Sequence, residues 1–240
     1  MLDKADAVRR KRLESLDVLD GFLGSVFLET FGDPVRNEKA WVRSEGASAI
    51  RSIEAGTSMG GEAQAPGSED WAVLKISAVT SGWYLPTERK TVSALPDRPI
   101  FPKRGDLLFS RANTRDLVAA TCLVDRDEDR TFLPDKLWKV SPNSEVATAE
   151  YLRFLFTNSG FRRMLTQQAT GSSGSMLNVS QDKVLRARFP LPPLHLQRQF
   201  ADLVWTTYGL RDSMLGASSQ ANRLLETAAW QAFRAKLEAD

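Results

Sequence analysis

The sequence predicts an α+β fold in which one sheet-rich domain is flanked by two long helices that pair in a coiled-coil-like spacer. Apolar residues recur at heptad spacing near both ends of the chain, whereas the middle holds short β-branched and aromatic runs separated by Gly, Pro and Asp. With 42% hydrophobic residues among 240, the chain can bury a core of this size. We expect an N-terminal helical segment over 1–36, the sheet-rich domain over 37–190, and a C-terminal long helix over 191–240.

The first predicted helix covers residues 2–31, which contain no proline. Its end is marked by Gly32, directly after the periodic residues, and by Pro34 two positions later. Apolar residues at alternating spacings of three and four predict a face that pairs with another helix. These pairing residues are Leu16, Leu19, Leu23 and Val26.

The middle of the chain is typical of strands joined by turns. The runs WAVLKISAV, GDLLFS, DLVAATCLV and KLWKV are rich in β-branched and aromatic residues, and turn-forming residues separate them. One helix is expected over residues 151–168, where apolar residues share a face. Residues 56–70 are too small and polar to pack, so we expect a mobile surface loop there.

The second long helix is predicted over residues 193–237, with Pro192 and Pro193 at its start. Such a helix is on the order of 65 Å long, so it needs a partner helix. That partner is either residues 2–31 or the same helix of a second chain. Its pairing seam follows a strict four-three alternation through Leu203, Thr207, Leu210, Met214, Ala217, Ala221, Leu224 and Ala228.

The sequence offers no catalytic or metal-binding motif. Cys122 is the one cysteine and His195 the one histidine, so neither a disulfide within the chain nor a Cys/His zinc site is expected. The stretch GSSGS lacks the spacing and lysine of a P-loop. No apolar run reaches the roughly 18–20 residues of a membrane span, and the charged N-terminus is not a signal peptide. We therefore expect a cytoplasmic protein that is not an enzyme, has no membrane contact and holds no metal.

Several polar residues suit recognition of a polyanion, because arginine can bond guanine, asparagine can bond adenine, and hydroxyls can bond phosphates. The alternative is that each is an ordinary exposed loop residue. Within GSSGSMLNVS, small residues would let backbone N–H groups approach a phosphate; the alternative there is a tight packing turn. The candidate DNA-binding residues are Lys75, Ser77, Ser110, Arg111, Asn113, Thr114, Arg115, Lys136, Ser172, Ser173 and Gly174.

Five stretches carry a resemblance to a known family. In order, LKISAV, GDLLFSRANT, PDKLWKV, ATGSSGSMLNVSQDKV and PLPPLHLQRQFA closely resemble the target recognition domain and following conserved helix of the specificity (S) subunit of type I restriction-modification systems. The start, LDKADAVRRKR through SVFLETFGDP, resembles the helix that follows such a domain. The resemblance covers nearly the whole chain.

The resemblance implies a DNA-binding subunit without catalytic activity. S subunits of this family carry two recognition domains, each reading half of a bipartite sequence in double-stranded DNA, and two long helices hold them apart. Modification (methyltransferase) subunits dock around them, carry S-adenosylmethionine and methylate adenine, and a restriction motor subunit joins for cleavage in defence against phage. The resemblance implies that residues 71–79, 106–115, 135–139 and 171–180 form the core and DNA-facing loops, with no cofactor on this chain.

The chain departs from the family because it has one recognition domain rather than two, which suggests a half-sized S subunit or a relic or fragment of a full one. Ala78 also stands where aspartate is frequent after KIS. Two chains that pair their exposed seams would restore two recognition domains about a two-fold axis, so we expect a homodimer that reads a palindrome with a fixed gap. Two alternatives remain: a truncated S-like assembly or regulatory protein that binds modification subunits without productive sequence readout, or an independent enzyme.

Overall fold

The structure, a computed structural model, describes residues 18–19, 21–60, 67, 70–167 and 177–237. The chain divides into two compact units. The larger unit comprises residues 30–201, and the smaller comprises residues 1–29 together with 202–240. Strands and short helices make up the larger unit and helices the described part of the smaller, so the predicted α+β class is confirmed.

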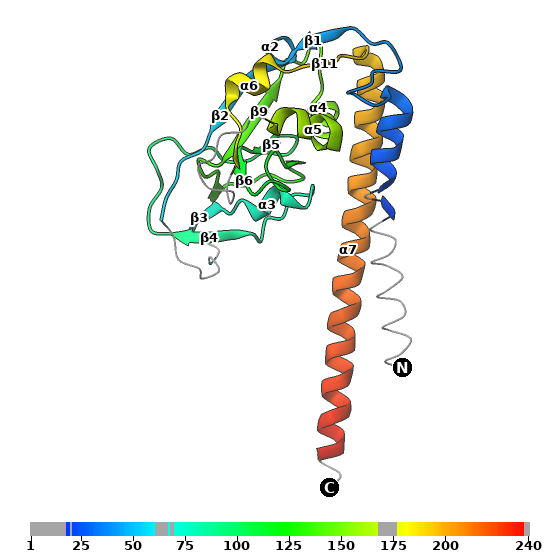
Figure 1. The fold of residues 1–240 in the computed structure, drawn as a ribbon. Coiled ribbons are helices and arrows are strands. Elements are labelled where there is room, and N and C mark those ends of the chain that lie inside the picture. Colours follow the sequence, from blue (N-terminus) through cyan, green and yellow to red (C-terminus); the bar gives the residue numbers. More distant parts are fainter. Residues whose placement is uncertain (1–17, 20, 61–66, 68–69, 168–176, 238–240) are drawn as a thin grey trace. The chain divides into compact units, whose positions relative to one another are not determined.

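Among the described residues, four β-sheets form the framework of the larger unit (Figure 1). The main sheet is antiparallel, with strand order β2-β9-β5-β7. A second sheet has the order β4-β3-β8, and the pairs β1-β11 and β6-β10 complete the set. The strands are β1 Arg43–Glu45, β2 Ile50–Ala55, β3 Trp71–Leu74, β4 Arg89–Val92, β5 Leu107–Ser110, β6 Ala112–Asn113, β7 Thr121–Leu123, β8 Thr131–Phe132, β9 Leu137–Pro142, β10 Leu177–Asn178 and β11 Arg188–Pro190.

The helices are short except for the last. They are α2 Gly46–Ala49, α3 Ser77–Thr80, α4 Ala149–Thr157, α5 Ser159–Thr166, α6 Gln181–Arg186 and α7 Leu194–Leu237. Residues 18–19 and 21–31 are also helical. The predicted long C-terminal helix is thus confirmed over nearly its whole expected range.

Strand β5 is central because both of its faces are covered. All four of its residues are buried, which explains why its sequence is apolar throughout instead of alternating with polar residues. Phe109 stacks on Trp138 of β9 at a centroid distance of 5.5 Å and meets Phe156 of α4 edge-on at 5.4 Å. Leu108, on the opposite face, packs in a cluster that includes Val79 of α3.

Two sequence expectations differ from the structure. The run LKISAV is not one strand, because β3 ends at Leu74 and α3 follows, burying Ala78 and Val79 against the core. The helix expected over 151–168 is two helices, because the chain leaves helical geometry at Asn158, with φ −58° and ψ 125°. The Asn158 side chain accepts a hydrogen bond from the N–H of Phe161 and so begins α5 as its N-cap.

The start of α7 is fixed within the larger unit by a buried amide. Gln197 is fully buried, and its Oε1 accepts a hydrogen bond from the N–H of Thr148 at 3.1 Å. Its Nε2 donates to the carbonyl oxygens of Val146 at 3.0 Å and Pro192 at 2.7 Å. One side chain therefore pairs three main-chain groups, the N–H of Thr148 and the carbonyl oxygens of Val146 and Pro192.

An aromatic cluster surrounds this point. The Phe31 ring lies edge-on to Tyr151 at 5.2 Å and to Phe200 at 5.4 Å, and Phe200 lies edge-on to Phe154 at 5.0 Å. The Tyr151 hydroxyl donates to the carbonyl oxygen of Pro190 at 2.6 Å. The preceding helix stops as predicted, because Gly32 adopts a φ of +78°, which residues with a side chain rarely take.

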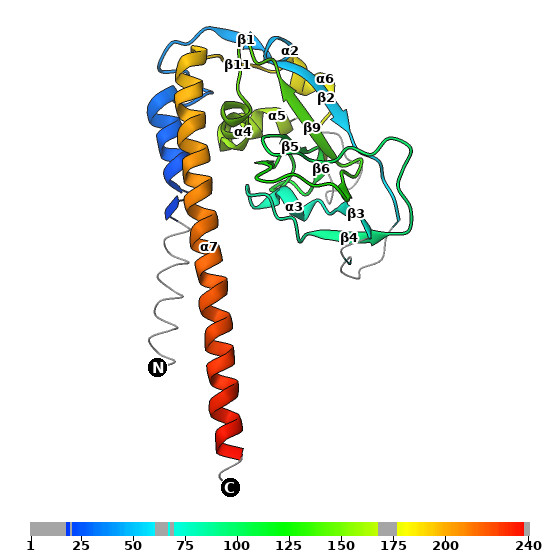
Figure 2. The ribbon, with the colours of Figure 1, turned by 180° about the vertical axis from the view of Figure 1, so that it is seen from behind.

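In the smaller unit, the helical residues 18–19 and 21–29 lie antiparallel beside α7 in both views (Figures 1 and 2). Leu23 and Phe27, one turn apart, are buried, and α7 buries Val204, Thr207 and Tyr208. Of these three buried residues of α7, Thr207 belongs to the predicted seam, whereas Val204 and Tyr208 are each the next residue after a seam position.

The predicted pairing residues differ in burial. Leu23 is buried, and Leu19, Val26, Leu203 and Met214 are half-buried. Leu210 has 52% of its surface exposed, and Ala217 is exposed. Pairing through these residues with a second chain stays a prediction. Leu16 lies outside the described residues, as do the side chains of Ala221 and Leu224, most of the predicted loop 56–70 and the whole of 1–17.

We predict that Gln197→Ala lowers the free energy of unfolding by about 2–3 kcal/mol, because it leaves buried main-chain groups unpaired. Gln199→Ala is the matched control, since Gln199 is exposed on the same helix. Chemical denaturation of the two variants checks this. Equal unfolding midpoints would show that the Gln197 amide contributes nothing.

Candidate nucleic-acid interface

Arg111 joins three chain segments through its main chain. It directly follows the central strand β5, and its N–H donates to the carbonyl oxygen of Lys136 at 3.0 Å. Its carbonyl oxygen accepts from the N–H of Val179 at 2.9 Å. The antiparallel pairing of β6 with β10 continues this junction, with Leu177 opposite Asn113. The predicted stretches GDLLFSRANT and PDKLWKV therefore meet at one place with the described part of GSSGSMLNVS, which begins at Leu177.

We call this place the Arg111 site and define it as residues 56–58, 111–115, 134–136 and 177–179. Residues 56–58 join it by a close main-chain approach. Thr57 donates its N–H to the carbonyl oxygen of Leu133 at 3.0 Å. A Cβ atom on Gly56 would stand 2.0 Å from that same oxygen, so only glycine fits there.

The Arg111 side chain is held by Asp135. Its Nε donates to the Asp135 carbonyl oxygen at 3.1 Å, and its Nη2 lies 3.7 Å from the carboxylate atom Oδ2. The other carboxylate oxygen, Oδ1, accepts a hydrogen bond from the Ser58 hydroxyl. About a third of each charged side chain, 36% for Arg111 and 37% for Asp135, remains exposed. The guanidinium is therefore restrained and still open to solvent.

The next residues form the turn between β5 and β7. The Asn113 Oδ1 accepts from the N–H of Thr114 at 2.8 Å, and the carbonyl oxygen of Thr114 accepts from the N–H of Val118 at 2.8 Å. Ala119 closes the turn with a φ of +62°. Thr114 and Arg115 are exposed at its tip.

Arg162 of α5 stabilises this turn through hydrogen bonds to its main chain. Its Nε donates to the carbonyl oxygen of Val118 at 2.6 Å, and its Nη2 donates to the carbonyl oxygen of Asp116. Burial lowers the pKa of Arg162 from its ordinary value, and the Asp116 carboxylate acts in the opposite direction. A guanidinium stays protonated under such shifts, so the turn is anchored by a permanent cation.

The Arg111 site presents chemistry that suits nucleic acid. Arginine and asparagine can each make two hydrogen bonds to one base edge, and the exposed Arg115 and half-buried Lys136 can meet phosphates as point charges. Within the described residues, the Asn113 amide nitrogen has no hydrogen-bond acceptor, so its donors are available.

The remaining candidates do not join this site. Ser110 differs from expectation, because its side chain is fully buried at the end of the central strand and cannot meet DNA there. Ser77 donates its hydroxyl to Oε2 of Glu88 at 2.6 Å, and Lys75 is exposed after β3. Ser172, Ser173 and Gly174 lie outside the described residues. The end of GSSGSMLNVS forms strand β10 and then Ser180, whose hydroxyl accepts from the N–H of Lys183 as the N-cap of α6.

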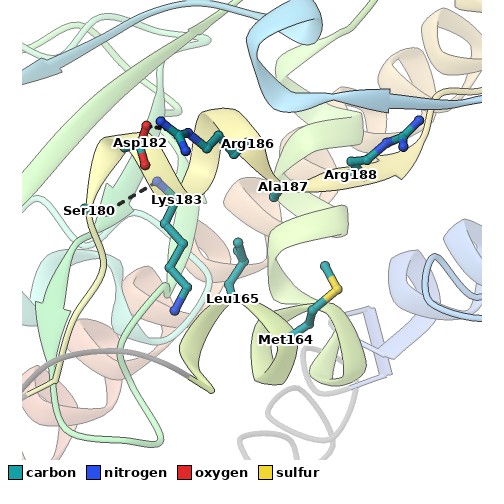
Figure 3. A pocket seen from close by; sticks show the side chains of 8 residues that line it. All are labelled: Met164, Leu165, Ser180, Asp182, Lys183, Arg186, Ala187 and Arg188. Carbon is teal, nitrogen blue, oxygen red and sulfur yellow. Dashed lines mark hydrogen bonds and ion pairs between the residues drawn. The ribbon is translucent and has the colours of Figure 1, made fainter.

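A separate groove of about 450 Å³ lies between α5 and α6 (Figure 3). Within it, Asp182 and Arg186 form an ion pair at 2.8 Å on one turn of α6. Burial lowers the pKa of Lys183 from its ordinary value. Among the candidate DNA-binding residues that the structure describes, none lines this groove, although Ser180 belongs to the predicted stretch 171–180. The lining is Met164, Leu165, Ser180, Asp182, Lys183, Arg186, Ala187 and Arg188.

Sequence reasoning missed Ser58 and Arg162, which shape the Arg111 site, and it gave Asp135 no role of its own within the predicted stretch 135–139. Asp135 had a signal, because it directly precedes the predicted Lys136 in the same turn. Ser58 and Arg162 had none, because each contacts a residue far away in the sequence. In the part of the chain that the structure describes, no cluster of His, Cys, Asp and Glu is placed to hold a metal ion, and no helix is long and apolar enough to cross a membrane.

One curated relative matches in sequence. Over 134 residues the chain is 30% identical to the specificity subunit of the type I restriction enzyme EcoEI of Escherichia coli. The match covers 55% of this chain and 23% of that subunit. No known family profile matches the chain.

Two solved structures share the fold over nearly the whole chain. The type I restriction-modification S subunit from M. genitalium superposes with a TM-score of 0.54 at 10% identity, covering 94% of this chain. A structure on complex assembly and conformational transition of the type I R-M system gives 0.50 at 16% identity, covering 93%. The chain spans about half the length of these two structures, 57% and 53%. The chain is thus similar in sequence to a type I specificity subunit over about half its length, and it shares its fold with the two solved structures.

Proposed function

We propose that the chain is a DNA-recognition subunit that reads one half-site of double-stranded DNA through the Arg111 site. The observation that carries this proposal is the convergence of Arg111, Asn113 and Lys136 on strand ends that are fixed by main-chain hydrogen bonds. A fixed frame matters because base readout requires hydrogen bonds to a given base edge, whereas phosphate contacts tolerate looser geometry.

The chain's partners follow from the same proposal. Modification subunits dock on the long helices and bring S-adenosylmethionine, so the chain itself carries no cofactor and no catalytic step. A restriction motor subunit joins this complex for cleavage. The curated relative supports this assembly because it is the specificity subunit of a restriction enzyme.

We further propose that two copies pair through α7 and the N-terminal helical residues. Three large apolar side chains of α7, Leu210, Leu215 and Trp230, have 52%, 38% and 65% of their surface exposed. Exposed apolar side chains on a long helix favour burial against another helix. Two copies related by a two-fold axis would present two recognition domains to a palindromic site.

We predict that Arg111→Ala relaxes base preference at one position by about 1–3 kcal/mol if the guanidinium reads a base. Asn113→Ala should act likewise at another position. The check is binding selection from a randomised duplex pool at several salt concentrations, using the chain with its co-purifying subunits. Arg98→Ala is the control, since Arg98 is exposed and outside the Arg111 site.

A uniform loss of affinity across all sequences would assign Arg111 to phosphate contact instead. If the wild-type complex binds every sequence equally, the chain is an assembly or regulatory protein and the proposed readout is wrong.

Replacing Leu210 and Met214 together with lysine should abolish self-association or assembly, because charge on a helix-pairing seam cannot be buried unpaired. The sheet-rich domain should stay folded, since Leu210 is largely exposed. Sedimentation with and without modification subunits measures this. Asp212→Lys, on the opposite side of the same helix, should assemble normally. Assembly that survives the double change would refute the seam.

A further inference from the structure

We infer that Asp135 is the positioning residue that sets the orientation of Arg111 for base readout, with Ser58 as its brace. This inference rests on the proposed function, because it assigns a role within the same DNA-reading site. Asp135 itself does not read DNA in this assignment: its two carboxylate oxygens face Arg111 and Ser58.

The contacts restrain the Arg111 guanidinium and leave its terminal nitrogens able to donate further hydrogen bonds. A guanidinium has five N–H donors, and within the described residues only the Nε donor makes a hydrogen bond, to the Asp135 carbonyl oxygen at 3.1 Å. The ion pair between Nη2 and Oδ2 at 3.7 Å is longer than a hydrogen bond. The terminal nitrogens can therefore still present the paired donors that recognise the N7 and O6 atoms of guanine.

Asp135 is itself held from two directions. The Ser58 hydroxyl donates to its Oδ1, and Ser58 is brought there by the close approach of Gly56 to Leu133. On the other side, the carbonyl oxygen of Lys136, the next residue, accepts the N–H of Arg111. The carboxylate thus stands at a fixed place relative to the main chain of the arginine that it orients.

The negative charge of Asp135 distinguishes a role in orientation from a general role in DNA binding. A carboxylate on a DNA-facing surface repels phosphates and weakens sequence-independent binding. A role in orientation compensates for that cost, because an arginine that is ordered before binding loses less conformational freedom on the DNA. Removal of the charge should therefore change selectivity and general affinity in opposite directions.

The test uses the full chain with its co-purifying subunits. Asp135→Asn keeps the size of the side chain and removes its charge. We expect a loss of about three- to tenfold in selectivity at the base pair that Arg111 reads. A loss of this size corresponds to weaker hydrogen bonds between the less well oriented guanidinium and the base. Affinity for unrelated duplex should stay equal or rise. Asp97→Asn, an exposed aspartate outside the site, controls for net charge and should leave selectivity unchanged.

Two further variants separate orientation from a general structural role. Ser58→Ala should lower selectivity in the same direction by a smaller factor, whereas Ser93→Ala, also at an exposed serine, should not. In an Arg111→Ala background, Asp135→Asn should cause no additional loss, because its effect passes through the arginine.

Selectivity that Asp135→Asn leaves intact overturns this inference alone. An equal loss in the Arg111→Ala background also overturns it, because Asp135 would then act on DNA directly or on the fold. A wild-type complex without any sequence preference overturns both this inference and the proposed function. Thermal unfolding of each variant shows whether a loss comes from misfolding, and a selectivity loss that tracks a lowered melting temperature counts against orientation.

Discussion

The candidate interface depends on the main-chain junction at Arg111. One residue donates its N–H to the turn before β9 and accepts with its carbonyl oxygen from the segment after β10. Because buried or half-buried main-chain groups must be paired, these two hydrogen bonds fix three distant segments against one another. The side chains of these segments converge because the main-chain hydrogen bonds fix the positions of their Cα atoms.

The core explains why this junction is rigid. Strand β5 carries Arg111 at its end, and α4 packs against one face of the strand and α3 against the other. A strand that is covered on both faces cannot shift its register without exposing apolar side chains or burying polar ones. The buried Ser110 belongs to this core, which is why its hydroxyl lies beneath the interface instead of on it.

Local signals in the sequence predicted much of this fold. The helix stop at Gly32, the strand GDLLFS and the long C-terminal helix follow from spacing and turn chemistry, which act over a few residues. The break at Asn158 was missed because the apolar residues on both sides of it keep a helical spacing. The N-cap role of Asn158 becomes evident only from the structure. Asp135 and Ser58 were missed because their roles depend on partners 24 and 77 residues away along the chain.

The main-chain character of the Arg111 junction has a consequence for how such a chain can change. Every residue has a carbonyl oxygen and every residue except proline has an amide N–H, so these hydrogen bonds impose almost no demand on the side chains at 111 and 136. Substitution there alters what the surface can hydrogen-bond and leaves the surrounding architecture in place. Stability and surface chemistry are therefore nearly independent at these positions, so point mutation can change the groups that this surface presents while the architecture stays in place.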